Sequence, residues 1–304
     1  MEFFKNNTKI PFMRQQKLAG VFSAVIFIAS ILALLMNGLN LGLDFTGGNQ
    51  AIIDFPAPVQ VNQLRENLVK AGFTEAQVQL YNIREISVYV GPHKELSSEE
   101  LKAKFLEIMP GGTIKSSTYM GPSVSKHLWS NGMLAMLVSL ILTMSYIAFR
   151  FEYRFALSAA VALIHDPMLI FGVFALFHLE FNMIVLTAVL TVIGYSLNDT
   201  IVVYDRVREN FRKIRKKQPK EIMDLSINQT LSRTIMTSGL TLLVVIALFI
   251  WGGPTVHGFA LALIIGIVIG TYSSIYVAGS MAIALGLTPA NLLPVQKKFE
   301  DGRP

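Results

Sequence analysis

The chain has 304 residues, of which 52% are hydrophobic and only 15% are charged. Soluble domains carry about 25% charged residues, so this composition is typical of a membrane protein and excludes an ordinary soluble domain. The net charge is +6, and the absence of cysteine excludes disulfides and thiolate metal sites.

The first apolar segment follows a basic N-terminus. Residues 1–17 contain four basic residues and one acid, and residues 18–36 are an uninterrupted apolar run of nineteen. A secretory signal has a shorter apolar core of about 7–15 residues, followed by a small-residue cleavage site that is missing here. We therefore expect an uncleaved first transmembrane helix with its N-terminus in the cytoplasm.

Residues 37–127 have a different character, because nine acids and eight bases are mixed among short apolar patterns. This mixture predicts a water-soluble domain inserted between membrane spans. Its alternating segments predict strands, and two segments have helical spacing. The order β-α-β-β-α-β is that of the ferredoxin-like fold, an α+β arrangement. The expected strands are residues 49–55, 77–81, 86–90 and 113–120, and the expected helices lie around residues 61–68 and 101–108.

Five further apolar spans bring the total to six, so the chain is expected to be a polytopic α-helical membrane protein. Basic residues flank one set of connections, whereas the connections 178–180 and 252–254 contain no Lys or Arg. The positive-inside rule places both termini in the cytoplasm and the inserted domain on the periplasmic side. The expected regions are a cytoplasmic N-terminus at 1–17, a span at 18–36, the domain at 37–127, five spans within 128–285 (about 132–149, 155–177, 183–204, 234–251 and 258–285), a basic cytoplasmic loop at 205–232 and a cytoplasmic tail at 286–304.

Asp199 lies inside the span at 183–204. Counted from Arg206, it is seven residues into the helix, about 10 Å below the basic end and too deep for a short carboxylate to reach the headgroups. A charge at that depth costs about 3 kcal/mol even on lenient insertion scales, so we interpret Asp199 as functional. The alternative is a neutral carboxyl that only holds a neighbouring helix.

Two other polar residues accompany Asp199 in the spans. Asp166 is near mid-membrane, next to Pro167, and either it or His165 is a candidate to serve the backbone carbonyl that the proline leaves free. Arg233 begins the fifth span near the cytoplasmic face. It is either an anchor that reaches the headgroups or a partner that moves against Asp199 and changes how readily that carboxyl binds a proton.

The last span and the basic tract at 206–220 have simpler interpretations. Gly266 and Gly270, followed by Thr271, Ser273 and Ser274, indicate close helix packing rather than a binding site. The basic tract holds eight Lys or Arg residues. It suits an amphipathic helix that lies on anionic lipids. Nucleic-acid binding is not favoured, because the positive-inside bias already accounts for the charge.

A polar turn follows the first span and leads into the first strand. Taken alone, Asp44 and Thr46 are turn residues, and Gly47 and Gly48 allow unusual backbone angles. This turn is also the first of several motifs. The others are residues 121–124, 193–203, 205–211, 232–234 and 237–239, and together with residues 42–48 they resemble the signature stretches of the SecF family, which supplies a subunit of the bacterial protein-export translocase.

The resemblance covers nearly the whole chain, and it departs from the family pattern at Pro167. It implies an RND-type half-transporter in the bacterial inner membrane that pairs with SecD, giving twelve spans. Such a complex is thought to use the proton-motive force to help preproteins pass through the SecYEG channel, with no cofactor besides the proton gradient. The implied proton-pathway residues are Asp199, Arg233, Asn198 and Asp166, and the implied coupling turn contains Asp44, Thr46, Gly47 and Gly48.

Three other functions compete with this interpretation. Asp166 and Asp199 lie in adjacent spans, so they could share a proton and activate water in an intramembrane aspartyl protease. An RND-type lipid or drug exporter would need an apolar tunnel in an inserted domain that is too small to hold one easily. The third alternative is an assembly subunit whose polar residues only hold a partner. We expect a transport protein rather than an enzyme.

Overall fold

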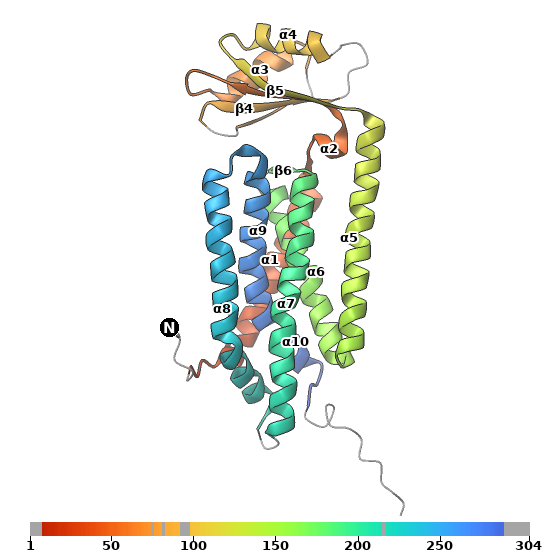
Figure 1. Ribbon diagram of the computed structural model, residues 1–304, viewed down its shortest axis with the longest axis vertical. Coiled ribbons are helices and arrows are strands. Elements are labelled where there is room, and N and C mark those ends of the chain that lie inside the picture. The colour runs from red at the N-terminus through yellow and green to blue at the C-terminus, as the bar shows by residue number, and fades with distance from the viewer. Residues whose placement is uncertain (1–7, 74–75, 81–82, 92–97, 215–216, 289–304) are drawn as a thin grey trace, which may run out of the picture.

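A bundle of long helices carries a small α+β domain at one end (Figure 1). The computed structural model describes residues 8–73, 76–80, 83–91, 98–214 and 217–288, so most of the expected C-terminal tail lies outside the described residues. Within these described residues, six helical segments are long and apolar enough to cross a membrane. They are α1 (Gln16–Asn37, preceded by the 3-10 turn η1, Phe12–Gln15), α5 (Pro122–Arg150), α6 (Tyr153–Leu176), α7 (Met183–Lys213), α8 (Pro219–Trp251) and a last span made of α9 (Pro254–Tyr272), the π-helical segment η2 (Ser273–Ala278) and α10 (Gly279–Ala284).

The small domain has the predicted β-α-β-β-α-β order. Its four strands form an antiparallel sheet in the order β3-β4-β2-β5. Helices α3 and α4 cover the face that points away from the bundle (Figure 1). Ala51, Ile53, Val88 and Leu68 are buried between these helices and the sheet. The elements are β2 (Gly48–Asp54), α3 (Val61–Lys70), β3 (Gln77–Leu80), β4 (Glu85–Val90), α4 (Ser98–Ile108) and β5 (Thr113–Met120).

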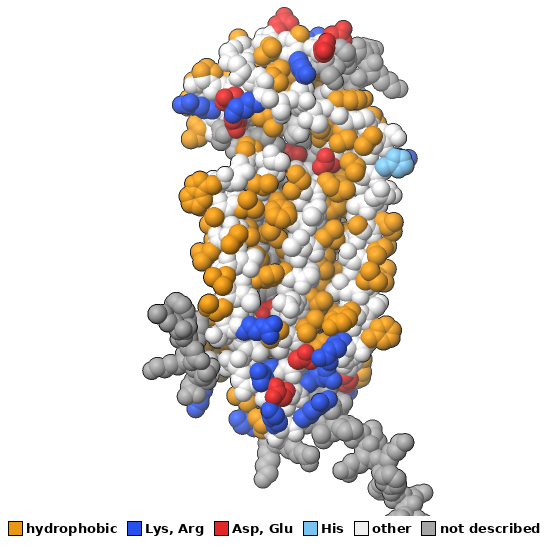
Figure 2. Space-filling view, in the orientation of Figure 1, with side chains coloured by type: hydrophobic (Ala, Val, Ile, Leu, Met, Phe, Trp, Pro, Cys, Tyr) orange, Lys and Arg blue, Asp and Glu red, His pale blue; other side chains and the backbone are white. Residues whose placement is uncertain are grey.

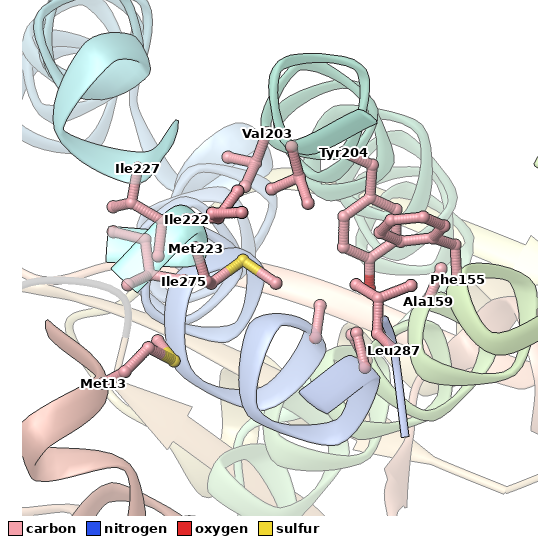
Figure 3. Close-up of a cluster of buried hydrophobic side chains, with 14 of the residues drawn as sticks. Met13, Phe155, Ala159, Val203, Tyr204, Ile222, Met223, Ile227, Ile275 and Leu287 are labelled. Carbon is pink, nitrogen blue, oxygen red and sulfur yellow. The ribbon is translucent and has the colours of Figure 1, made fainter. Parts of the chain in front are cut away.

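The helices of the bundle approach closely at glycine. A Cβ added to Gly172 of α6 would collide with Ser30 of α1, and a Cβ added to Gly266 would collide with Val192 of α7. Lipid provides no hydrophobic force between helices, so tight packing of this kind contributes much of their association. The end of the bundle remote from the domain has its own core, in which the rings of Phe155 and Tyr204 lie 4.6 Å apart (Figure 3).

Three helices extend beyond the expected limits of their membrane spans. Helix α5 begins at Pro122 rather than after residue 127, because a proline at the first helical position has no N–H that needs an intrahelical partner. The basic segment 205–232 is mostly helix, since α7 runs to Lys213 and α8 starts at Pro219. Asn210 donates hydrogen bonds of 2.8 Å to Ser226 and Gln229 of α8.

The apolar face of the basic tract also differs from the expectation. We expected it to lie on lipid as a separate helix. Val207 and Phe211 are instead buried in the core with Ile222 and Met223 of α8. The tract therefore extends two membrane helices, and charged side chains gather at this end of the bundle on the face that Figure 2 shows.

The coupling turn joins the domain to the start of α7. Residues 43–46 form the short helix α2 (Leu43–Thr46), and Asp44 accepts a 2.9 Å hydrogen bond from the backbone N–H of Met183, the first residue of α7. Beside it, β1 (Asn40–Leu41) pairs in parallel with β6 (Glu180–Phe181). The carboxylate of Asp44 therefore satisfies one of the free N–H groups at this helix N-terminus, where negative charge is favourable.

Gly47 and Gly48 both have positive φ, +69° and +122°. A Cβ on Gly48 would also collide with the carbonyl oxygen of Val90 on the neighbouring strand β4. Thr46 closes the turn by donating a 2.9 Å hydrogen bond to the carbonyl of Gly42. The turn therefore needs glycine for its backbone angles and, at Gly48, for the close approach of β4.

Glu180 lies against this turn. Burial raises the pKa of its carboxyl above the ordinary value of 4.5; a hydrogen bond from Asn182 opposes the shift, and the nearby charge of Asp44 adds to it. The folded protein therefore favours the protonated form of Glu180 more than the unfolded chain does. This stabilisation is fully present below the ordinary pKa and is lost as the pH rises through the raised pKa.

Substitution Gly48→Ala is expected to weaken the sheet next to the turn. Gly111 serves as the control, because it also has positive φ, +87°, but no heavy atom within 4 Å of an added Cβ. Both substitutions strain the backbone, and overpacking against Val90 adds about 1–3 kcal/mol at Gly48. Hydrogen exchange of the β2 and β4 amides in the full-length protein measures the difference; equal loss of protection in the two variants would contradict it.

Substitution Glu180→Gln is expected to stabilise the protein at neutral pH, because the neutral amide is buried without the cost of a charge. The thermal midpoint of the parent should rise as the pH falls from about 8 to about 5, and this dependence should flatten in the variant. Glu66→Gln on the exposed face of α3 is the control. A variant that keeps the parental pH dependence would rule out Glu180 as its source.

Candidate functional site

Two carboxylates lie in the interior of the bundle. Asp166 on α6 is 1% exposed and Asp199 on α7 is 9% exposed. Among the described residues no hydrogen bond joins one carboxylate to the other, and each is held by hydroxyl groups of neighbouring helices. The sequence-based expectation of two buried acids in adjacent spans agrees with this arrangement.

Asp199 is held from two sides. Thr234 of α8 donates a 2.5 Å hydrogen bond to Oδ1, and Ser274 of the last span donates a 2.9 Å hydrogen bond to Oδ2. Thr234 is 2% exposed and Ser274 is fully buried. Within a bilayer a carboxylate has no bulk water to solvate it, so these hydroxyls provide its polar contacts.

Asp166 has a similar set of partners. Its Oδ2 accepts hydrogen bonds from Ser196 of α7 at 2.5 Å and from Ser273 of the last span at 2.8 Å. Its Oδ1 lies 3.0 Å from Nδ1 of His165. In the described part of the chain, no hydrogen bond connects either side chain to the backbone carbonyl that Pro167 leaves free. The geometry therefore gives no support to the interpretation that His165 or Asp166 serves this freed carbonyl.

A π-helical segment places two consecutive serines against the two acids. Ser273 and Ser274 open the segment Ser273–Ala278; the first serine bonds Asp166 and the second bonds Asp199. Single π-helical turns inside α-helices occur frequently at functional sites. From the sequence we expected these serines to serve helix packing. The signal that could have identified them is the run of hydroxyl side chains in a membrane span without charged residues.

Asn198 and Arg233 are not brought into this cluster. Both side chains are exposed, and neither takes part in a hydrogen bond or ion pair within the described residues. Thr234, the residue after Arg233, makes the direct contact with Asp199, which the sequence analysis did not predict.

This arrangement suits reversible protonation. A carboxylate accepts from two hydroxyls, and after protonation one of those hydroxyls can turn to accept from its single O–H while the other continues to donate. No group of three or more metal-binding side chains occurs in the described parts of the chain. The four residues of the turn lie elsewhere, at the domain end of α7. Asp44 of the turn bonds the first residue of this helix, and Asp199 lies in its middle.

Comparison with known proteins identifies the family. Residues 100–288 match the family described as protein export membrane protein SecD/SecF, C-terminal, and residues 32–55 match the SecD/SecF GG motif. The protein translocase subunit SecF of Vibrio alginolyticus is 46% identical over 98% of this chain and 97% of its own length. The Pseudomonas aeruginosa protein of the same name is 41% identical over 98% of this chain and 100% of its own length.

Solved structures agree with these sequence matches. The crystal structure of SecDF from Thermus thermophilus, described as a translocon-associated membrane protein, superposes with a TM-score of 0.86 at 36% identity over 93% of this chain. A SecDF structure described as the super-membrane-facing form gives a TM-score of 0.69 at 36% identity over 92% of this chain. This chain spans 39% of each SecDF chain. Six membrane helices with an inserted ferredoxin-like domain, the expected RND-type half, are confirmed, and the chain belongs to the SecF family of protein translocase subunits.

Proposed function

We propose that this chain pairs with SecD and uses the proton-motive force to promote the late steps of preprotein passage through SecYEG. The observation that carries the proposal is Asp199, a buried carboxylate in the middle of a membrane helix, held by hydroxyls from two other helices. Such residues in membrane proteins mark ion and proton pathways. The family of this chain favours export over the protease and the lipid or drug exporter.

The orientation follows from charge. Lys and Arg side chains gather at the end of the bundle remote from the small domain, and apolar side chains surround its middle (Figure 2). The positive-inside rule assigns that end, with both termini, to the cytoplasm and the small domain to the periplasm of a bacterial inner membrane. Anionic lipid headgroups are suitable partners for this basic end.

An exposed polar stripe supports α7 as part of the contact with SecD. Thr187, Thr191, Gly194 and Asn198 are all exposed and recur every three or four residues along this helix. Small and hydroxyl-bearing residues permit close helix approach in a membrane, and an exposed amide there gains a partner by contact with another helix. Asn198 and Arg233 therefore lie where a SecD helix would cover them.

Burial by SecD would give Arg233 its expected role. A guanidinium facing lipid is costly, whereas the same group enclosed between two subunits beside Asp199 contributes a fixed positive charge to the proton pathway. Arg233 and Asn198 then belong to the assembled site rather than to the isolated chain. No cofactor other than the proton gradient is required.

The coupling turn offers a mechanical link from this site to the periplasmic domain. One elementary charge that crosses the membrane potential contributes about 2.3 kcal/mol per 100 mV, enough to bias two domain positions that differ by a few kcal/mol. Asp44 attaches the base of the domain to the first residue of α7, which also carries Asp199. The existence of two forms of SecDF is consistent with such movement.

Asp199→Asn tests the proposal most directly. The amide has nearly the same shape and can bond Thr234 and Ser274, so the variant should insert and pair with SecD, but it cannot exchange a proton. Translocation of an exported protein into the lumen of inverted vesicles should then be equal with and without a proton gradient. Thr200→Val removes a buried hydroxyl next to Asp199 and serves as the control. Full gradient dependence in Asp199→Asn would refute the proton role.

Gly194→Leu tests the SecD contact. Gly194 has no heavy atom of this chain within 4 Å of an added Cβ, so the substitution should leave the chain itself undisturbed. A leucine in the polar stripe should separate the helices and reduce the amount of SecD that co-purifies. Val25→Phe on the exposed side of α1 adds similar bulk and should have no effect. Normal recovery of SecD with Gly194→Leu would place the contact elsewhere.

A further inference from the structure

A groove of about 480 Å³ lies between α1, α6 and the last span. Its wall is mostly apolar, yet it includes His165 of α6 and Ser280 of α10. Nε2 of His165 and Oγ of Ser280 are both buried, and among the described residues neither has a hydrogen-bond partner. Two unpartnered polar atoms at the wall of an otherwise apolar groove are costly in a membrane, so this feature requires an explanation.

His165 connects this groove to the carboxylate cluster. The side chain is 5% exposed, and its Nδ1 faces Asp166 at 3.0 Å. With a neutral ring that donates from Nδ1, Nε2 is an acceptor without a donor; with a charged ring, Nε2 is a donor without an acceptor. A water molecule would satisfy either form, because water both donates and accepts.

Phe27 of α1 stacks on the His165 ring at the wall of the groove. Its ring is parallel to that of His165, with an interplanar angle of 7° and centroids 5.9 Å apart, and it also lines the groove. Phe27 is half-buried. A change in the position of this one side chain would therefore alter whether water in the groove reaches Nε2.

The groove lies in the half of the bundle that is nearer the chain termini. Gly20 is four residues after the start of α1, and Ala284 is the last residue of α10. Both ends belong to the side where basic residues gather. Water that enters from this side would meet His165 before it meets either carboxylate.

We propose that His165 is the group through which Asp166 exchanges a proton with water in this groove, and that Phe27 is the gate that closes the exchange. This inference rests on the proposed proton-driven function. With the gate open, a hydronium ion in the groove gives its proton to Nε2: one O–H bond breaks, one N–H bond forms and water is released. The resulting imidazolium passes its Nδ1 proton to Oδ1 of Asp166 across the 3.0 Å contact: the Nδ1–H bond breaks, an O–H bond forms and the ring is left neutral with its proton on Nε2. The reverse sequence returns the proton to water in the groove.

The surroundings suit such a pair. The imidazolium would neutralise Asp166, which is the ionisable group hydrogen-bonded to His165. The other ionisable side chains on the elements packed around His165 include Tyr272 and Tyr276 of the last span and Lys17 at the start of α1. Ser273 donates a hydrogen bond to Asp166, and Ser274 donates one to Asp199. Protonation of the His165–Asp166 pair therefore affects Asp199 through this one π-helical turn.

The test is proton leak through the purified complex of this chain with SecD in liposomes, followed with an enclosed pH-sensitive dye. Phe27→Ala opens the gate and should raise the leak at least about tenfold, which corresponds to a barrier lower by about 1.4 kcal/mol. Val25→Ala, on the exposed side of the same helix, is the control and should leave the leak unchanged. Adding His165→Asn to Phe27→Ala should return the leak to the parental rate, because asparagine cannot carry the proton.

Gly20→Leu provides a second suppressor. An added Cβ at Gly20 has no heavy atom within 4 Å, so a leucine can extend into the groove and displace water without touching His165. It should also suppress the leak of Phe27→Ala. No leak in Phe27→Ala, or a leak that persists after His165→Asn or after Gly20→Leu, would overturn the inference. Because the leak is measured without export, this result is distinguishable from failure of the Asp199→Asn experiment.

Discussion

The need of a buried carboxylate for hydrogen-bond donors organises the centre of this protein. In the membrane interior, water is not freely available, so Asp166 and Asp199 depend on hydroxyls from other helices. Ser196 belongs to α7, Thr234 to α8, and the serine pair to the last span. Four spans are thereby joined through two side chains. Any change in the charge of either acid alters contacts in several helices at once.

Helix α7 transmits this constraint over its full length. Its first N–H is held by Asp44 from the coupling turn, its middle carries Asp199, and Asn210 near its other end bonds α8. A rigid helix with attachments at three levels can convert a local proton event into displacement at both ends. The small domain is connected to the start of this helix, which makes α7 the mechanical axis of the proposed function.

Sequence patterns predicted the architecture because the apolar and polar character of each segment depends only on the environment that its surface meets. Six apolar spans, the mixed composition of the inserted domain and the alternation of its strands reflect which surfaces meet lipid, water or a core. The same reasoning failed for the basic tract. Its charged residues were read as a membrane-surface helix, whereas Val207 and Phe211 pack against α8. Composition shows that a face is apolar but cannot show which neighbour buries it.

The sequence by itself determined the class of protein, its six spans, its inserted fold and the depth of Asp199 within its span, because the cost of a charge in lipid depends on depth along one helix. Only the tertiary structure decided which groups meet that charge. Thr234 lies beside Asp199 while its neighbour Arg233 points outward, and the π-helical turn directs Ser273 and Ser274 to different acids. These pairings depend on helix rotation and on one local change of helical hydrogen bonding, which long-range packing sets and which no spacing within a single span encodes.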